Sequence, residues 1–519
     1  MKKLNYRTLS EIGYQGYIGE EAPERVLQFG EGNFMRAFVD DFIDQMNEKA
    51  DFCAKAVLVA PIPPMPGNVD MKQILNEQEG LYTLYLRGRE NEKTVERKRI
   101  ISCVSRCLNA YTDFEEVMAC ADNPDLRFII CNTTEAGIVY DESCRFADRP
   151  ASSYPGKLTQ FLYRRFQKYR NEAGKGFLIL ACELIDDNGK ELERCVLQYA
   201  GQWELGADFA EWLEKENIFC STLVDRIVTG FPQGAAPKYN QENGYEDKAM
   251  DTGELFGFWI IEGPDSIRDE FPYEKAGLPI LVTNDHKPYK QRKVRILNGA
   301  HTAMVLGAHL AGKNIVRECM EDEVIFGFFK QAVYKEIIPT LSLPNAELVS
   351  FAAAVEERFC NPYIDHALLS ISLNSTAKWR ARILPSIKEY QKRRHGELPP
   401  CLSASLAFYV AFYRRACNKE GGWFSAKAGG GEYRIADDEK VLKFFEEHGK
   451  DDARMLVSEV CARGDFWGED LTLLQGMEER VYEDLAVIEE EGAYELMKRI
   501  RKEYLAVGCS GEFAEAELE

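Results

Sequence analysis

An apolar run leads directly into two glycines in the segment RVLQFGEGNFMRAF, residues 25–38. The apolar part predicts a buried strand, and the apolar residues that recur from Asn33 onward predict a helix that ends near residue 49. Gly30 and Gly32 would let the backbone turn tightly between the two elements and approach a pyrophosphate, which the free N–H groups of the helix would bind. The third glycine of the usual G-x-G-x-x-G pattern is replaced by Met35, so a plain tight turn remains the alternative.

The pattern of apolar and polar residues changes near residue 280. Before it, short apolar runs alternate with amphipathic stretches, which is typical of a parallel sheet with helices on both faces. After it, the strand signal fades and long helical patterns dominate. We therefore predict an α/β protein, with a Rossmann-like doubly wound domain over residues 1–280 and an all-helical C-terminal domain over residues 281–519.

Composition and charge exclude several classes of protein. The 519 residues are 45% hydrophobic and 29% charged, which are globular values. The net charge of −21 argues against a general binder of nucleic acid or of anionic membranes. No apolar run reaches the roughly 20 residues of a membrane helix, and the N-terminus lacks the apolar core of a secretory signal.

The 15 cysteines are scattered, without a C-x-x-C pair. They predict neither a zinc ribbon nor a disulfide framework, and free thiols in a reducing cytoplasm are the expected state. We expect a cytoplasmic protein that acts on a small molecule. The sequence leaves the oligomeric state open, a monomer included.

In a dinucleotide-binding fold, an acidic residue after the second strand usually holds the adenosine ribose. The residues that follow the predicted second strand here are APIPP, residues 60–64. They include neither an acid for the ribose nor an arginine for a 2′-phosphate. Direct reading therefore leaves NAD and NADP both open.

The segment KQRKVRILNGAHT, residues 290–302, carries the strongest chemical signal. On an α-helix at about 100° per residue, Lys293, Asn298 and His301 fall in one half of the helix. Reduction of a carbonyl needs a proton donor for the developing alkoxide and neutral donors that polarise the C=O. A lysine buried near another cation can have its pKa lowered enough to supply that proton. For this motif alone, a solvated helix lysine followed by a turn at Asn298 is the simpler interpretation.

The two motifs together resemble the mannitol dehydrogenase family of long-chain polyol and uronate dehydrogenases. CNTTEAG (residues 131–137) and CELIDDNG (residues 182–189) support the resemblance, which runs from about residue 20 to beyond residue 385. It implies hydride exchange between NAD(H) and a sugar-type carbonyl in a cleft between two domains, without a metal. The stretch FMRAF (residues 34–38) replaces the His-rich stretch of polyol members and resembles the branch that reduces D-tagaturonate to D-altronate.

The resemblance also implies roles for particular residues. Lys293 would be the general acid in reduction and the general base in oxidation, and Asn298 would polarise the carbonyl. Asn188 matches a second family asparagine at the catalytic centre, and His301 would orient substrate hydroxyls. The implied cofactor-binding residues are Gln28, Phe29, Gly30, Glu31, Gly32, Asn33, Phe34, Asn132 and Thr133.

A uronate carries a carboxylate that a polyol lacks, and binding it in a partly dry cleft requires a cation. Lys378 and Arg382 lie i and i+4 in NSTAKWRAR, residues 374–382, so both can point the same way. His366 is a further candidate. An ordinary solvated basic face is the alternative interpretation.

Other functions remain open at this point. Fructuronate reductases and mannitol-type polyol dehydrogenases share the K-x4-N-x2-H motif and differ in the substrate pocket, which one sequence does not display. A nucleotide-binding sensor that has lost catalysis would keep the glycine turn but lose the proton donor. The presence of Lys293, Asn298 and His301 together disfavours the sensor.

Overall fold

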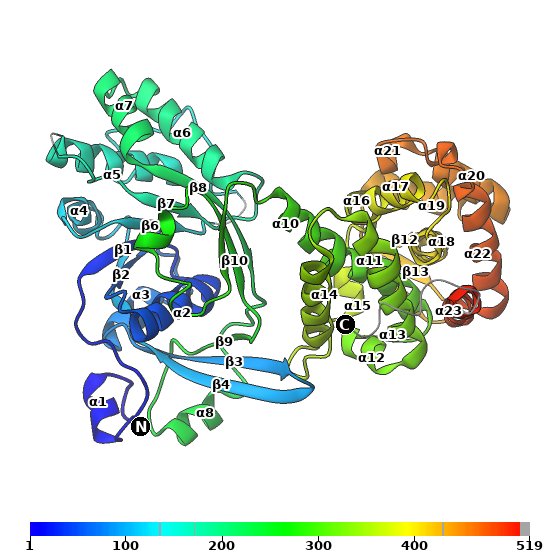
Figure 1. Cartoon of the computed structure of the whole chain (residues 1–519), viewed down its shortest axis with the longest axis horizontal. Coiled ribbons are helices and arrows are strands. Elements are labelled where there is room, and N and C mark those ends of the chain that lie inside the picture. The colour runs from blue at the N-terminus through cyan, green and yellow to red at the C-terminus, as the bar shows by residue number, and fades with distance from the viewer. Residues whose placement is uncertain (134–135, 171, 428–429, 509–519) are drawn as a thin grey trace. The chain divides into compact units, whose positions relative to one another are not determined.

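The computed structural model describes residues 1–133, 136–170, 172–427 and 430–508. The chain forms two compact units (Figure 1). Unit 1 comprises Met1–Gly88 and Val95–His286, and unit 2 comprises Arg89–Thr94 and Lys287–Glu519. Among the described helices, none combines the length and the apolar character that crossing a bilayer requires.

Unit 1 is built on an eight-stranded sheet with the order β11-β10-β8-β7-β6-β1-β2-β5. Its strands pair in parallel, except that β10 runs antiparallel to β8. The run β5-β2-β1-β6-β7-β8 has the Rossmann strand order, which confirms the predicted fold. The strands are β1 (Glu24–Phe29), β2 (Lys55–Ala60), β5 (Val104–Asn109), β6 (Phe128–Cys131), β7 (Leu178–Ala181), β8 (Ile218–Asp225), β10 (Phe258–Glu262) and β11 (Ile280–Thr283).

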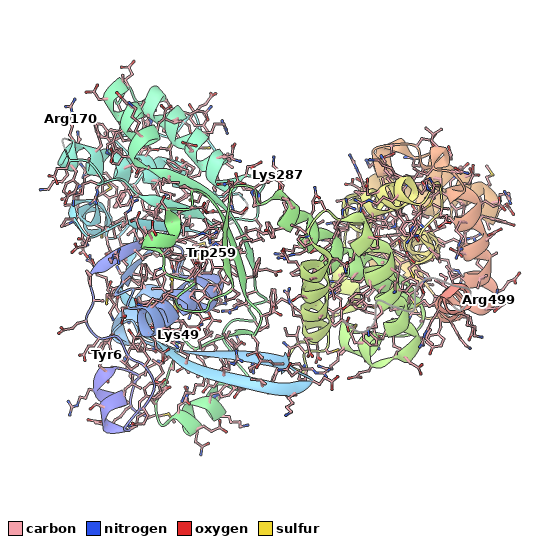
Figure 2. All side chains as sticks on the ribbon, viewed as in Figure 1. Tyr6, Lys49, Arg170, Trp259, Lys287 and Arg499 are labelled. Atoms are coloured by element: carbon pink, nitrogen blue, oxygen red, sulfur yellow. The ribbon has the colours of Figure 1, made fainter. Side chains whose placement is uncertain are left out.

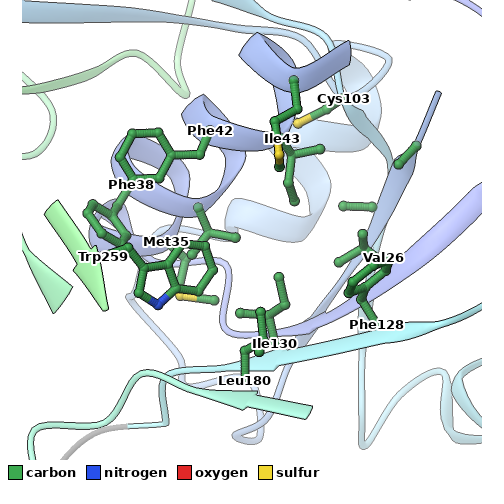
Figure 3. Packing of buried hydrophobic residues seen from close by; sticks show 14 of the residues in the cluster. Val26, Met35, Phe38, Phe42, Ile43, Cys103, Phe128, Ile130, Leu180 and Trp259 are labelled. Atoms are coloured by element: carbon green, nitrogen blue, oxygen red, sulfur yellow. The ribbon is translucent and has the colours of Figure 1, made fainter. Parts of the chain in front are cut away.

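Two apolar cores cover the two faces of this sheet. Val26 of β1 faces the core that contains α2, and its neighbour Leu27 faces the opposite core. In the first core, Phe38 and Phe42 pack around the ring of Trp259, which lies inside unit 1 (Figures 2 and 3). Burial on both faces explains why these strands are continuous apolar runs. The helices of unit 1 are α1 (Tyr6–Glu11), α2 (Asn33–Ala50), α3 (Met71–Glu77), α4 (Phe114–Ala119), α5 (Tyr154–Tyr169), α6 (Asn188–Gln202), α7 (Ala207–Glu216), α8 (Ala236–Asn243) and α9 (Ile267–Glu270).

A second, three-stranded sheet has the order β4-β3-β9. Its strands are β3 (Tyr82–Glu90), β4 (Lys93–Ile101) and β9 (Asp251–Glu254). Residues 89–94, at the turn between β3 and β4, are grouped with unit 2, where Arg89 forms an ion pair of 3.7 Å with Glu357. The turn is therefore a separate short segment of unit 2.

Unit 2 is helical, as predicted, with α18 at its centre. Nearly every side chain of α18 is buried, and a helix that is apolar on all sides belongs in a core. The principal helices are α10 (Lys287–Arg292), α11 (Gly299–Leu310), α12 (Val316–Glu321), α13 (Glu323–Lys330), α14 (Asn345–Phe359), α15 (Leu368–Ile371), α16 (Ser375–Arg382), α17 (Leu384–Arg393), α18 (Pro400–Tyr413), α19 (Glu439–His448), α20 (Ala453–Ala462), α21 (Gly464–Trp467), α22 (Met477–Glu491) and α23 (Ala493–Gly508).

Two features depart from the expected organisation. Unit 2 contains a three-stranded antiparallel sheet of β12 (Cys417–Lys419), β13 (Gly422–Ala426) and β14 (Glu432–Ile435), which the helical patterns did not indicate. The boundary between the units falls after His286 rather than at residue 280, because β11 still pairs with β10 in the sheet of unit 1.

Candidate functional site

The glycine loop after β1 lies where the strand order of the sheet reverses. Gly30 adopts φ +123°, and its N–H donates to the Val59 carbonyl at 2.9 Å. A Cβ on Gly30 would lie 3.0 Å from the carbonyl oxygen of Asn132, so both the backbone conformation and the close approach require glycine. The Asn132 N–H donates to the Phe29 carbonyl at 3.0 Å. The loops after β1 and β6 are thus neighbours at the switch point, where open α/β sheets bind ligands.

Gly32 has a different role in the loop. It is the N-cap of α2, an 18-residue helix, and has an ordinary φ of −68°. A Cβ on Gly32 would meet no atom within 4 Å, so nothing in unit 1 demands glycine there. The open space in front of a helix N-terminus is suited to a phosphate group.

The remaining predicted cofactor residues fall into two groups. Gln28 and Phe29 are buried inside unit 1 and offer no side chain to a ligand at the surface. Glu31, Asn33, Phe34, Asn132 and Thr133 are partly or fully exposed around the loop. Burial raises the pKa of the Glu31 carboxyl.

Several of these exposed residues are also held from within unit 1. Asn33 accepts a hydrogen bond of 2.7 Å from the Arg36 guanidinium, and the ring of Phe34 stacks on Phe38 at 5.1 Å. The backbone N–H and the hydroxyl of Thr133 both donate to Glu183, each at 3.0 Å. The loop is therefore ordered by contacts that do not depend on a ligand.

A cavity of about 610 Å³ lies beside the glycine loop, at the carboxyl end of β2. Its lining includes Glu31 and Asp70 as acids and Lys72 as a cation. Lys72 forms an ion pair with Asp113, and Asp70 caps α3 by accepting a 2.9 Å hydrogen bond from the Gln73 N–H. The sequence pattern predicts an acid directly after β2 and therefore misses both of these acids. Glu31 precedes β2, and Asp70 follows its last residue by ten positions.

The motif K-x4-N lies on a π-helix, Lys293–Asn298, between α10 and α11. An α-helix places residues four apart one above the other, whereas the i→i+5 hydrogen bonds of a π-helix do this for residues five apart. Lys293 and Asn298 are five apart. The α-helical geometry assumed from the sequence is therefore replaced by one that aligns this pair more closely.

Two buried polar atoms at this motif have no hydrogen-bond partner within the described residues: Oδ1 of Asn298 and Nε2 of His301. The His301 ring stacks on Phe359 at 4.0 Å and lies 5.4 Å from the ring of His366. Buried polar groups without partners are rare in folded proteins. They indicate a place where a polar ligand supplies the missing partners.

Four cationic or titratable side chains of unit 2 surround His301. Burial first, and then the charges of these four groups, lower the pKa of His301 well below its usual value, so the ring is neutral at physiological pH. The group consists of the cations Arg358, Lys378 and Arg382 together with His366, whose own pKa is lowered by burial and by the Lys378 charge; we call it the cationic group.

The members of the cationic group come from three segments: Arg358 from α14, His366 from the residues before α15, and Lys378 and Arg382 from α16. Arg382 donates to the Thr302 hydroxyl at 3.4 Å, and Lys378 donates to the Ile371 carbonyl at 2.9 Å. Burial, and then the Arg382 charge, lower the pKa of Lys378. The three residues predicted for a substrate carboxylate thus gather beside His301. Arg358 was missed, because nothing in the sequence connects α14 with the motif.

Asn188 belongs to unit 1, whereas Lys293, Asn298 and His301 belong to unit 2. The Asn188 amide donates to the carbonyls of Glu183 and Thr222 at 2.9 and 3.0 Å. Its oxygen accepts from the N–H groups of Gly189 and Thr222, each at 2.9 Å. Both amide protons are used in this conformation, so Asn188 fastens the start of α6 to β8 and has no donor left for a substrate.

Within the described residues, two clusters have the composition of a metal site. The first consists of Asp187, Glu262 and His286. Its two carboxylates already contact a cation, because Lys190 Nζ lies 2.6 Å from Glu262 and 3.3 Å from Asp187. The second, His448, Asp451 and Glu459, is partly exposed at the end of α19. Neither cluster includes a residue of the glycine loop or of the K-x4-N-x2-H motif.

Comparison with known proteins identifies the family. The mannitol dehydrogenase Rossmann domain matches residues 24–275, and the mannitol dehydrogenase C-terminal domain matches residues 285–480. The chain belongs to the mannitol dehydrogenase family. It is therefore an oxidoreductase of CH–OH groups, as its sequence motifs predicted.

Relatives that match this mannitol dehydrogenase family member over nearly its full length share the name of one activity. An altronate oxidoreductase of Klebsiella pneumoniae is 45% identical over 495 residues, which cover 94% of this chain and 97% of that protein. An altronate oxidoreductase of Escherichia coli is 44% identical over 505 residues, covering 96% and 99%.

Solved structures agree on the fold. A D-sorbitol dehydrogenase in substrate-free form has a TM-score of 0.78 at 20% identity, covering 96% of this chain and all of that one. The ternary complex of Pseudomonas fluorescens mannitol 2-dehydrogenase with NAD and D-mannitol has a TM-score of 0.65 at 19% identity, covering 96% and 99%.

Proposed function

We propose that this chain is an NAD-dependent tagaturonate reductase (altronate oxidoreductase). It would transfer hydride between NADH and the keto group of D-tagaturonate to give D-altronate. The observation that carries the proposal is the cationic group around a neutral His301. Such a group suits a sugar acid better than a neutral polyol, because the partly buried Lys378 and Arg382 can pair with a carboxylate.

The cofactor is NAD, and the glycine loop holds its pyrophosphate. The fit rests on the open space at Gly32 and on the free N-terminus of α2. When bound, the nicotinamide supplies or accepts the hydride. Glu31 and Asp70, which line the adjoining cavity, are the acids available for ribose hydroxyls, which favours NAD over a cofactor with a 2′-phosphate.

Lys293 transfers the proton. In reduction its ammonium donates to the oxygen that develops negative charge, and in oxidation the neutral amine accepts the proton of the reacting hydroxyl. The Asn298 amide polarises the same oxygen without adding charge. The alignment of the two residues on the π-helix supports this division of work.

His301 orients the substrate. Its imidazole is neutral, so the unpartnered Nε2 can exchange a hydrogen bond with a sugar hydroxyl. Lys378, Arg382 and His366 bind the carboxylate. Asn188 acts as a positioning residue in unit 1, since its amide is fully used there.

Fructuronate reductase is the alternative within the same chemistry. Both hexuronates are anions with a keto group, so the cationic group does not separate them. The full-length likeness to altronate oxidoreductases favours tagaturonate. The same proposal places the enzyme in the cytoplasm, because the cysteines of the described part are free thiols and most are buried.

The test offers D-tagaturonate, D-fructuronate and D-fructose in parallel and follows NADH oxidation at 340 nm, then repeats the panel with NADPH. The expected result is preference for tagaturonate and for NADH. Preference for fructuronate or fructose would refute the substrate assignment, and preference for NADPH would refute the cofactor assignment.

A second arm of the test addresses the carboxylate. Arg382→Met should raise KM for the uronates about tenfold to a hundredfold, since a hydrogen bond to a charged group is worth about 1.5–3 kcal/mol. Activity on fructose should change little. Arg380→Met, an exposed arginine on the same helix, is the matched control and should leave both unchanged.

A further inference from the structure

Arg36 follows the glycine loop by four residues and is only 1% exposed. It lies on α2, and its guanidinium donates to three separate pieces of unit 1. Nε donates to the Glu31 carbonyl at 3.0 Å, and Nη2 donates to Oδ1 of Asn33 at 2.7 Å. Nη1 donates to the Ala249 carbonyl, just before β9.

Two further residues, Asp251 and Tyr82, also hold Arg36. Nη2 lies 3.5 Å from Oδ2 of Asp251, and the guanidinium carbon lies 5.2 Å from the centre of the Tyr82 ring. The Tyr82 hydroxyl donates to the backbone carbonyl of Arg36 at 2.8 Å. These contacts fix the position of the planar guanidinium, whose N–H donors form a fork, independently of any ligand in front of the loop.

The hydrogen bond to Glu31 has a consequence for the next residue. A trans peptide is planar, so its C=O and N–H point in opposite directions. Because the Glu31 carbonyl points to the buried guanidinium, the N–H of Gly32 points away from it. The Gly32 carbonyl accepts from the Arg36 N–H at 3.2 Å, which fixes the glycine from its other side as well.

We propose that Arg36 is a positioning residue for the cofactor: by binding the Glu31 carbonyl it presents the Gly32 N–H to the pyrophosphate. Within the described residues that N–H has no hydrogen-bond acceptor, and the space beside Gly32 is open. Arg36 itself touches no cofactor. The inference rests on the cofactor part of the proposed function and not on the identity of the sugar.

Unit 1 contains a matched control for a purely structural arginine. Arg226 is also buried, and it binds the same helix through the Ala37 carbonyl at 2.6 Å and Asp41 at 2.8 Å. It donates to no group of the glycine loop. Replacing Arg226 should lower the free energy of unfolding, as replacing Arg36 should. Only the replacement of Arg36 should also change the orientation of the Gly32 N–H.

The experiment compares Arg36→Lys and Arg226→Lys with the wild type as full-length proteins. The dissociation constant of NADH is measured by nicotinamide fluorescence, and KM and kcat by steady-state kinetics. Arg36→Lys keeps the charge but loses the fork. We expect it to raise the NADH dissociation constant and KM about tenfold to a hundredfold, with kcat at saturating NADH within about twofold.

Equal NADH affinity in Arg36→Lys and wild type would overturn the inference, and so would equal weakening in both variants at similar Tm. Failure of the wild type to bind NADH would refute the proposed function as well, so the two failures are distinguishable. If Arg36→Lys does not fold, Asp251→Asn is measured instead. It loosens the fork while keeping Arg36, and an unchanged NADH affinity there would also overturn the inference.

Discussion

Lys293 is the residue on which the proposed chemistry depends most. We expect Lys293→Ala to lower kcat by about 10²–10⁴-fold, because it removes the proton donor. NADH binding should be unchanged, since the glycine loop belongs to unit 1. Turnover at 340 nm and a fluorescence titration with NADH measure the two quantities.

Lys287→Ala is the control for this variant, because Lys287 is an exposed lysine at the start of unit 2 (Figure 2). It should behave as the wild type in both measurements. Near-normal turnover of Lys293→Ala would remove Lys293 from the mechanism.

The two glycines of the loop predict opposite outcomes. Gly30→Ala forces a side chain onto φ +123° and within 3.0 Å of a carbonyl oxygen, so it should cost about 1–3 kcal/mol of stability. Gly32→Ala should leave Tm unchanged but weaken NADH binding, because the new methyl group fills the space meant for a phosphate. Thermal unfolding and NADH titration separate the two, and a large loss of Tm in Gly32→Ala would contradict the assignment.

At the scale of elements, the π-helix Lys293–Asn298 and the start of α18 show what periodicity does not reveal. Apolar spacing identifies a helix, but it does not say where α-type hydrogen bonds give way to π-type ones. α18 begins after Pro399 and at Pro400, neither of which can cap it with a side chain. The cap is Glu336 from another helix, which accepts from the N–H groups of Cys401 and Leu402 at 3.0 and 2.9 Å.

Glu336 gives an element-scale prediction. Burial raises the pKa of its carboxyl to about 7, above its unfolded value, so its contribution to stability falls as pH rises from about 4.5 to about 7. A glutamine at this position does not ionise, so Glu336→Gln should not lose stability over this pH range. Urea unfolding from pH 5 to pH 8 should therefore show a flatter pH dependence for Glu336→Gln.

The exposed Glu447 supplies the control for that measurement. Glu447→Gln should retain the pH dependence of the wild type. A slope for Glu336→Gln equal to that of the wild type would show that Glu336 ionises normally in the folded protein.

At the scale of the whole molecule, buried carboxyls in both units titrate in the same direction. Burial raises the pKa of Asp40 and of Asp251 in unit 1 to about 7, as it does for Glu336 in unit 2. We expect the wild type to unfold at higher urea concentration at pH 6 than at pH 8. Below about pH 4.5 stability should fall again, because Lys190 and His286 lower the pKa of Glu262 to about 2.

Salt distinguishes this cause from surface repulsion. The net charge of −21 also disfavours the folded state at high pH, but added salt screens exposed charges far more than buried ones. The difference in unfolding midpoint between pH 6 and pH 8 should therefore persist in roughly 0.5 M NaCl, at about the size that it has in low salt. Its disappearance in salt would assign the effect to the surface.

Circular dichroism and tryptophan fluorescence should both be followed, because two units need not unfold together.

Features that are local in the chain follow from the order of the amino acids alone. Apolar runs identified the parallel strands, and the glycine pair between strand and helix marked the loop at the switch point, because backbone freedom and side-chain polarity are properties of single residues. The spacing of Lys293, Asn298 and His301 placed them on one helical segment for the same reason.

Contacts between residues that are distant in the chain depend on how the helices and strands pack. Arg358, His366 and Arg382 come from three segments and surround His301 only because the helices of unit 2 pack as they do. Asn188 lost its expected catalytic donor because Glu183 and Thr222 fold against its amide. Hydrogen bonds and charges act through space, and neither the partners of a polar group nor the pKa that they impose can be read along the chain.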